Sequence, residues 1–341
     1  MAPPLVRRAV CVPLLFVLTL LVVVLFPVVW PVATLMSRLG GERNRAVRLL
    51  WFALAWGVLE SSAVLACGWL WCRSLGRTER SKDRHYEIIR RYVAGLHRVA
   101  QRRLGLRLDV SGSSSAEPEG DRPLIVLSRH AGPGDALLLV HHLLTDYRRE
   151  PRVVMKALLQ LDPCIDIAAN RLPNVFVAPG GGITEQIEQL AGTLGPRDAL
   201  LIFPEGGNFT PARRRRAIRR LVRMRRHREA ARAARMTHVM PPRPGGALAA
   251  IAAAPNADVV FVAHSGLEEM DSVGDVWRLV PLTDVVRAHW WRIPAEDVPV
   301  GREARLDWLY AQWEQVDAWI GAQHTGTGGG QRRGLETGEC F

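Results

Sequence analysis

The sequence predicts an α/β fold with a mixed, largely parallel sheet flanked by helices, preceded by an N-terminal hydrophobic helical segment that anchors the chain in a membrane. Two observations lead to this fold class. Short apolar runs alternate with helical stretches through the middle of the chain, as in proteins whose strands are buried under helices. The first 72 residues are instead dominated by two long apolar segments.

The alternation places the expected strands and helices in order. Each apolar run has the length of a buried strand and is bounded by turn-forming or polar residues. The expected strands are Leu124–Leu127, Val153–Met155, Val175–Ala178, Ala199–Phe203 and Val259–Ala263. The expected helices among them are Ala136–Thr145, Ile183–Leu194 and Ala247–Ala254. Sites in such sheets lie in the loops beyond the strand ends, so functional residues are expected there.

A membrane anchor is expected at the N-terminus. No charged residue lies between Ala9 and Ser37, and this stretch is long enough to cross a hydrocarbon core of about 30 Å. A second apolar stretch, Leu49–Cys72, has Glu60 as its single charge, so it either completes a membrane hairpin or lies in the interface. An even number of crossings puts the large domain in the cytoplasm, and the expected location is the cell inner membrane.

Three units are expected along the chain. Residues 1–82 form a membrane-anchoring helical hairpin, residues 83–324 a catalytic domain that begins with an amphipathic helix over 83–104, and residues 325–341 a glycine-rich disordered tail. The five cysteines show neither a paired framework nor the spacing of metal ligands, and no metal site is expected: Cys11, Cys67, Cys72, Cys164 and Cys340.

The excess positive charge is concentrated in one segment. The net charge of the chain is +12, and residues 211–235 contain twelve arginines and one glutamate. Such a run either forms a basic helix that attracts anionic headgroups or a phosphorylated substrate, or is a solvated insertion. A membrane-tethered nucleic-acid-binding protein is an alternative, but the run has no interleaved aromatic residues for base stacking, so no nucleic-acid partner is expected.

A histidine and an aspartate flank a tight turn after the first expected strand of the alternation. The segment Ser128–Leu139 reads SRHAGPGDALLL. With Arg129 and His130 exposed at the strand end, glycines on either side of Pro133 let the chain fold back so that Asp135 reaches an imidazole nitrogen of His130. A carboxylate there fixes the tautomer and leaves the other nitrogen free to act as a base. The other interpretation is an ordinary strand-to-helix turn with an incidental histidine.

Two further loops carry residues suited to a ligand. The run Phe203-Pro204-Glu205-Gly206-Gly207-Asn208 presents an acid at a strand end with glycines that let a ligand approach the backbone. Arg243 lies just before an expected helix, where an arginine suits a phosphate.

Taken together and in this order, the motifs resemble those of the glycerolipid acyltransferase family, over roughly residues 85–290. The run His130–Asp135 matches the histidine-four residues-aspartate motif of that family, and Phe203–Gly206 matches its Phe-Pro-Glu-Gly block. Lys156 stands where the family has a lysine after the second strand, and the Pro241-Pro242 loop resembles its proline-containing block.

The resemblance implies transfer of a fatty acyl group from acyl-CoA or acyl-carrier protein to the free hydroxyl of a lysophospholipid, foremost 1-acyl-glycerol-3-phosphate. His130 is then the base and Asp135 its orienting carboxylate, with no cofactor besides the acyl donor as co-substrate. The residues expected to bind substrate are Arg129, Lys156, Arg171, Phe203, Pro204, Glu205, Gly206, Gly207, Asn208 and Arg243. A catalytically silent lipid-binding member of the same fold is the alternative.

Two departures from the family pattern concern the acceptor. Gly207-Asn208 stands where the family has Thr-Arg after its glycine, and Pro179 stands near an expected arginine, with Arg171 upstream. In the family those arginines hold the acceptor phosphate. Here Arg213–Arg216 or Arg243 are expected to take that part.

Overall fold

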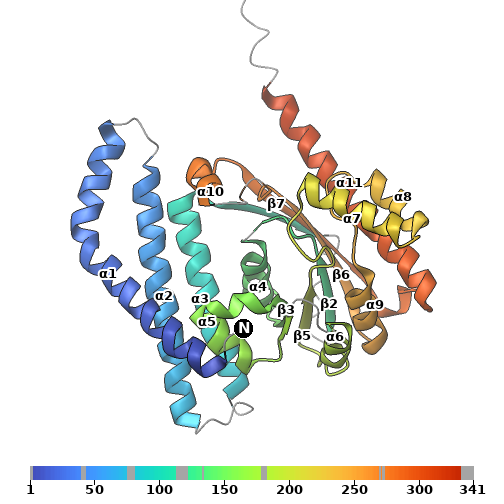
Figure 1. Cartoon of the computed structure of the whole chain (residues 1–341), viewed down its shortest axis with the longest axis horizontal. Helices are drawn as coiled ribbons and strands as arrows, with labels where there is room; N and C mark the ends of the chain where they lie inside the picture. Colours follow the sequence, from blue (N-terminus) through green and yellow to red (C-terminus); the bar gives the residue numbers. More distant parts are fainter. Residues whose placement is uncertain are drawn as a thin grey trace, which may run out of the picture.

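A computed structural model describes residues 3–39, 44–74, 81–112, 122–132, 134–177, 183–268, 270 and 273–331 (Figure 1). Its strands are β1 (Arg107–Gly112), β2 (Leu124–Ser128), β3 (Glu150–Lys156), β4 (Val175–Val177), β5 (Asp198–Ile202), β6 (Asp258–Ser265) and β7 (Val285–Ile293). Its longer helices are α1 (Pro4–Leu39), α2 (Arg45–Ser74), α3 (Lys82–Val99), α4 (Asp135–Thr145), α5 (Pro163–Ala168), α6 (Ile183–Ala191), α7 (Pro211–Arg223), α8 (His227–Arg235), α9 (Pro244–Ala253), α10 (Val273–Leu279) and α11 (Arg302–Gln331). Short helical turns are η2 (Ala100–Leu104), η3 (Ala157–Leu161), η4 (Ala169–Arg171) and η5 (Ala295–Asp297).

The described strands form one mixed, mostly parallel sheet in the order β1-β7-β6-β2-β5-β3-β4. The central strand β2 pairs in parallel with β5 on one side and with β6 on the other. Only the β6–β7 pair is antiparallel. The carboxyl ends of β2, β5, β3 and β6 therefore meet at one edge of the sheet, where the expected functional loops begin.

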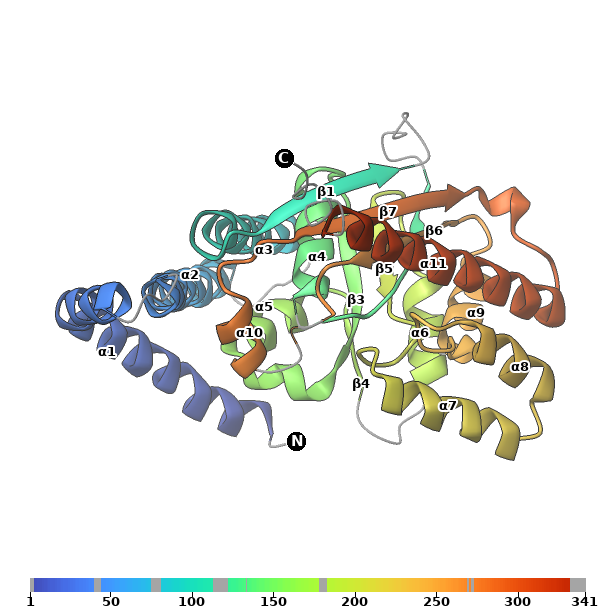
Figure 2. The ribbon, with the colours of Figure 1, turned by 90° about the horizontal axis from the view of Figure 1, so that it is seen from above.

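Alternating side chains of the strands build a core on each face of the sheet. In β2, Ile125 and Leu127 face a core shared with α6, α9 and α11, whereas Leu124 and Val126 face the opposite core under α4. All four side chains are almost fully buried. This is the period-two pattern of a strand covered on both faces, and it explains the continuous apolar runs in the sequence (Figure 2).

The N-terminal helices pack side by side at one end of the molecule (Figures 1 and 2). Both are long and apolar enough to cross a membrane. The helix α1 is exposed along nearly its whole length, whereas α2 buries residues including Val64 and Cys67 against α3 and α5. Arg7 and Arg8 at the start of α1 form ion pairs with Asp166 on α5, so the hairpin is tied to the sheet domain by charge as well as by packing.

The structure adds elements that the alternation of apolar runs did not predict. The edge strand β1 and the long strand β7 extend the sheet, and α11 covers the core on the face opposite α4. The helix α11 continues to Gln331, so the tail boundary expected at residue 325 falls inside a helix, and residues 332–341 of that tail lie outside the described residues. The expected amphipathic helix over 83–104 corresponds to α3 followed by η2.

The arginine-rich segment forms two helices. The first, α7, begins with Pro211 after Thr210, whose side chain accepts a hydrogen bond from the Arg213 N–H at 3.2 Å. It ends where Arg225 adopts a positive φ of 58°, and α8 follows. Both helices lie at the side of the molecule opposite α1 and α2 (Figure 2).

Candidate active site

Three strand ends bring the candidate functional loops together. His130 follows β2, Phe203 follows β5, and His264 lies near the end of β6. The backbone N–H of Phe209 donates to the His130 carbonyl at 3.0 Å, and the Arg243 N–H donates to the Pro204 carbonyl at 2.8 Å. These bonds fix the loops after β2 and β5, and the segment before α9, relative to one another.

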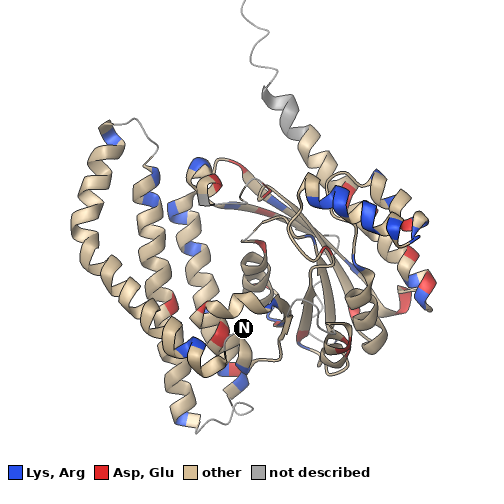
Figure 3. Cartoon of the chain, in the orientation of Figure 1, with Lys and Arg blue, Asp and Glu red and all other residues tan. Residues whose placement is uncertain are grey.

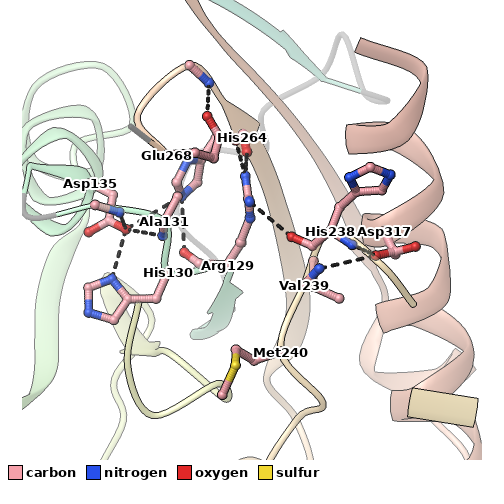
Figure 4. Close-up of polar contacts among 12 residues, drawn as sticks. Arg129, His130, Ala131, Asp135, His238, Val239, Met240, His264, Glu268 and Asp317 are labelled. Carbon is pink, nitrogen blue, oxygen red and sulfur yellow. Dashed lines mark hydrogen bonds and ion pairs between the residues drawn. The ribbon is translucent and has the colours of Figure 1, made fainter. Parts of the chain in front are cut away.

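His130 and Asp135 meet across the turn, as the sequence predicts. The Nδ1 atom of His130 lies 2.9 Å from Oδ2 of Asp135 (Figure 4). Because an ionised carboxylate only accepts hydrogen bonds, Nδ1 carries the proton in the neutral ring and Nε2 is left as the basic nitrogen. Nε2 points away from Asp135, and 19% of the His130 side chain remains exposed. The pair therefore has the geometry of a general base with an orienting carboxylate.

The Asp135 carboxylate is held by several N–H groups at the start of α4. Its Oδ2 atom also accepts from the backbone N–H of Ala131 at 2.9 Å and of Gly132 at 3.3 Å, and Oδ1 accepts from the N–H of Ala136 at 2.7 Å. Burial alone would raise the pKa of Asp135, but the His130 hydrogen bond, the nearby His264 and the Gly132 N–H lower it below its usual value. Asp135 is therefore ionised and rigidly placed.

Gly132 is required at the turn because the backbone after β6 approaches it closely. A Cβ atom on Gly132 would lie 2.7 Å from the carbonyl oxygen of Leu267. Any side chain there would push the turn away from the segment after β6 and move Asp135 with it. Pro133, between the two glycines, lies outside the described residues, and α4 begins at Asp135.

Arg129 departs from the expected position. The sequence places it exposed beside His130, but the structure buries it, with 1% of its surface accessible. Its guanidinium forms an ion pair with Glu268 and donates to the carbonyls of His264, at 2.6 Å, and His238, at 3.0 Å. The difference arises because Arg129 continues the strand direction of β2: its N–H donates to the Val262 carbonyl of β6. Since side chains alternate between the two faces of a strand, the Arg129 side chain lies on the same buried face as Leu127. Arg129 thus fastens the end of β2 to β6 and to the loop before α9.

His264 belongs to the site although the sequence did not single it out. Its Nε2 atom lies 3.1 Å from the Arg129 carbonyl oxygen and 3.7 Å from Oδ2 of Asp135. Because a carbonyl accepts, Nε2 carries the proton, and this N–H also lies close to the Asp135 carboxylate. Burial lowers the pKa of His264, which keeps the ring neutral. The signal in the sequence was a histidine in an otherwise apolar strand, one residue past the predicted end at Ala263.

The loop after β5 places an aromatic ring and a buried acid against the base. The Phe203 ring lies 4.6 Å from the His130 ring, centroid to centroid. Glu205 is fully buried and accepts a hydrogen bond from the Met240 N–H at 3.4 Å. Burial raises the pKa of Glu205 to about 8, against the opposing effect of the Arg129 guanidinium. Glu205 is therefore mostly protonated at neutral pH.

A cationic cavity of about 630 Å³ opens beside this loop. Its lining joins the glycines after Glu205 to the arginine-rich helix α7 and to the Pro241–Pro244 segment. The basic residues that line it are Lys156, Arg213, Arg216, Arg220, Arg223, Arg226 and Arg243. Gly206 has a φ of 68°, and a Cβ there would meet the Arg243 guanidinium at 2.9 Å, so the glycine admits this arginine to the cavity.

Most of the other expected substrate-binding residues lie at the cationic cavity. Lys156, Glu205, Gly206, Gly207 and Arg243 line the cationic cavity together. Asn208 lies at its edge, where its carbonyl accepts from Arg213 at 3.2 Å.

Arg171 is held elsewhere in the fold. Its guanidinium donates to the Cys67 carbonyl on α2 at 2.6 Å and contacts His85 on α3, and it is not part of the cavity lining. Pro179 lies outside the described residues.

A second, narrow cavity of about 90 Å³ lies between α4 and the sheet. Its lining is almost entirely apolar, with contributions such as Leu139, Val262 and Trp290, and Asp135 and His264 are among its few polar members. Asp135, the partner of His130, thus borders the apolar cavity, and the Glu205–Gly207 loop borders the cationic one. This arrangement suits a substrate with an apolar chain and an anionic group.

The fold and these contacts place a histidine–carboxylate pair at the strand ends of an α/β sheet. The sequence matches the model of the acyltransferase family over residues 107–279, just over half of the chain, and the chain belongs to that family. Among solved structures, it is similar to the 1-acyl-sn-glycerophosphate (LPA) acyltransferase PlsC of Thermotoga maritima, with a TM-score of 0.51 and 15% sequence identity. The similarity covers 82% of this chain and 98% of that one. No curated protein sequence matches the chain significantly.

Proposed function

We propose that this acyltransferase moves a fatty acyl group from a thioester donor to the free hydroxyl of a lysophospholipid, foremost 1-acyl-glycerol-3-phosphate. The observation that carries the proposal is the His130–Asp135 pair, 2.9 Å apart, at a sheet edge where Asp135 borders an apolar cavity and the loop after β5 borders a cationic one. A lysophospholipid has one acyl chain, one phosphate and one free hydroxyl, which matches these three features.

His130 provides the proton transfer that the reaction needs. Its Nε2 takes the proton from the acceptor hydroxyl as that oxygen attacks the thioester carbonyl carbon. The ionised Asp135 stabilises the imidazolium that forms. The carbon–sulfur bond then breaks, and the leaving thiolate takes the proton back from His130. The new ester keeps the acyl group, so atoms and charges balance without a covalent enzyme intermediate.

The two cavities give the substrate its orientation. Lys156 and Arg243, which line the cationic cavity together with the Glu205–Gly207 loop, bind the acceptor phosphate as charge-assisted hydrogen-bond donors. The apolar cavity under α4 receives acyl chain next to Asp135. Protonated Glu205 adds no negative charge to the phosphate site.

The N-terminal hairpin suits an enzyme whose substrate and product are both lipids. Residues 1–82 anchor the chain in the membrane, and residues 83–324 form the acyltransferase domain beside it. We place the chain in the cell inner membrane with its catalytic domain in the cytoplasm, where thioester donors are made.

The test is an acyl-transfer assay on the purified full chain in detergent. Thiol release from palmitoyl-CoA is followed with a panel of lysophospholipids that differ in headgroup, and with no acceptor. We expect release that depends on lysophosphatidate and that falls at least about 100-fold in His130→Ala, the low end of what a general base contributes. His227→Ala, an exposed histidine on α8, is the matched control and should keep the wild-type rate. Lipid binding without thiol release for any acceptor would instead identify a silent lipid-binding member of the fold.

A further inference from the structure

The arginines of α7 form an ordered face of the cationic cavity. Arg213, Arg216, Arg220 and Arg223 all line it. At 3.6 residues per turn, their spacing of three, four and three residues places them within an arc of about 80°. Figure 3 shows that Lys and Arg residues are concentrated along α7 and the neighbouring α8. Arg215 and Arg219, on the same helix, are exposed and do not line the cavity.

The charges of this face are not neutralised within the protein. Among the residues that the structure describes, none of the seven cationic side chains of the cavity takes part in an ion pair with an acid. Those of α8 do: Arg228 and Arg232 pair with Asp307, and Arg232 and Arg235 pair with Glu314. The sole acidic residue in the cavity lining is Glu205. Neighbouring segments of one arginine run thus have different surroundings: arginines of α8 pair with acids, whereas the α7 arginines that line the cavity are available to bind an external anion.

The cavity holds more charge than an acceptor phosphate requires. A phosphate monoester carries about −1.5 to −2 charges at neutral pH, which Lys156 and Arg243 match on their own. The eleven residues from Arg213 to Arg223 extend about 15 Å along the helix axis, far longer than one phosphate. The remaining arginines therefore suit a second ligand group that carries more than one phosphate.

We propose that Arg220, Arg223 and Arg226 bind the nucleotide end of coenzyme A, through its 3′-phosphate and its diphosphate. This rests on the proposed function, because it identifies the acyl donor as a coenzyme A thioester. The concave site, of about 630 Å³, has the size of a small-molecule pocket rather than of a protein interface. Leu221, Met224 and Pro241 also line it and offer apolar surface to an adenine ring.

The test is binding of adenosine 3′,5′-bisphosphate to the full chain in detergent micelles, measured by titration calorimetry at low salt. We expect a single site whose affinity falls at least about tenfold in the double variant Arg220→Gln with Arg223→Gln, since each charge-assisted bond contributes appreciably. The matched control, Arg215→Gln with Arg219→Gln, removes the same charge from the same helix and should change the affinity less than about twofold. Adenosine 5′-diphosphate, which lacks the 3′-phosphate, should bind more weakly than the bisphosphate.

Three results would overturn the proposal. The first is no binding of the bisphosphate, and the second is equal weakening by both double variants. The third is a double variant Arg220→Gln with Arg223→Gln that binds the bisphosphate normally but no longer binds phosphatidylglycerol vesicles, which would mark α7 as a membrane contact. The binding readout needs no acyl transfer. Bisphosphate binding without transfer would therefore refute the proposed function alone, and transfer without bisphosphate binding would refute this proposal alone.

Discussion

His264 is a second imidazole that contacts the Asp135 carboxylate. Its Nε2 atom lies 3.7 Å from the carboxylate oxygen that also accepts from the His130 Nδ1–H. The negative charge of Asp135 is thereby shared between two imidazole rings. Because His264 does not line the cationic cavity, it acts as a positioning residue rather than by contact with the acceptor phosphate.

We expect His264→Leu to move the acid limb of the kcat/KM profile to higher pH, because the Asp135 charge then acts on the His130 imidazolium alone. His264→Gln, which restores an N–H donor, should return the limb towards its wild-type position. The measurement is the pH dependence of acyl transfer for both variants and the wild type. Equal losses of rate with unchanged profiles would show that His264 only supports the fold.

Glu205 predicts a pH dependence of stability. Its pKa is about 8 in the folded chain, against an ordinary value of 4.5. Between these values the unfolded chain has lost a proton that the folded chain still holds, so the free energy of unfolding falls as pH rises. Glu205→Gln removes this effect and should raise the melting temperature relative to wild type at pH 8 but not at pH 5. The corresponding gain in the free energy of unfolding at pH 8 is at most about a few kcal/mol.

The control for Glu205 is Glu188→Gln, an exposed glutamate on α6. It should leave the melting temperature unchanged at both pH values. The prediction is contradicted if the difference in melting temperature between wild type and Glu205→Gln is the same at pH 8 and at pH 5. That result would show that Glu205 is ionised when buried.

At the scale of elements, α4 carries the site in two ways: its first residue orients the base, and its inward face closes the apolar cavity. We expect Leu139→Trp, which fills that cavity, to shift donor preference towards shorter acyl chains. Leu137→Trp is the matched control because Leu137 is 43% exposed on the same helix and does not line the cavity. The measurement is the ratio of transfer rates for C8 and C16 donors; the same ratio in both variants would exclude the cavity as the acyl site.

The elements that sequence reasoning predicted and those it missed differ in burial. The strands β2, β5 and β6 are buried throughout, so each appears as a continuous apolar run. By contrast, β7 mixes arginine and histidine with tryptophan and is only partly buried, and β1 is mostly exposed. Such strands are specified by pairing with distant segments, which a local pattern does not show.

The same distinction applies to the site. His130 and Asp135 are five residues apart, so their contact follows from the turn between them. His264 reaches the same carboxylate through the pairing of β6 with β2, more than a hundred residues away in the chain. Arg129 was expected to be exposed, and this was wrong for the same reason: its partners Glu268 and His238 are distant in the chain.

At the scale of the whole molecule, α1 offers the largest exposed apolar surface, including Val17, Leu20 and Val24. Because α2 is partly buried against the sheet domain, α1 is the helix expected to contact lipid most extensively. We expect the full chain to stay in the membrane fraction after high-salt and alkaline carbonate washes and to need detergent for release. Release by salt alone would mean that the association is electrostatic and that α1 does not enter the bilayer.

The account depends most on Asp135 acting through His130. The decisive measurement is a double-mutant cycle on the rate of acyl transfer to lysophosphatidate, with His130→Ala, Asp135→Asn and the double variant. Two groups that act as a unit are non-additive. We predict that His130→Ala lowers the rate at least about 100-fold and that adding Asp135→Asn lowers it no further. A His130→Ala enzyme with the wild-type rate, or losses that multiply in the double variant, would contradict the account.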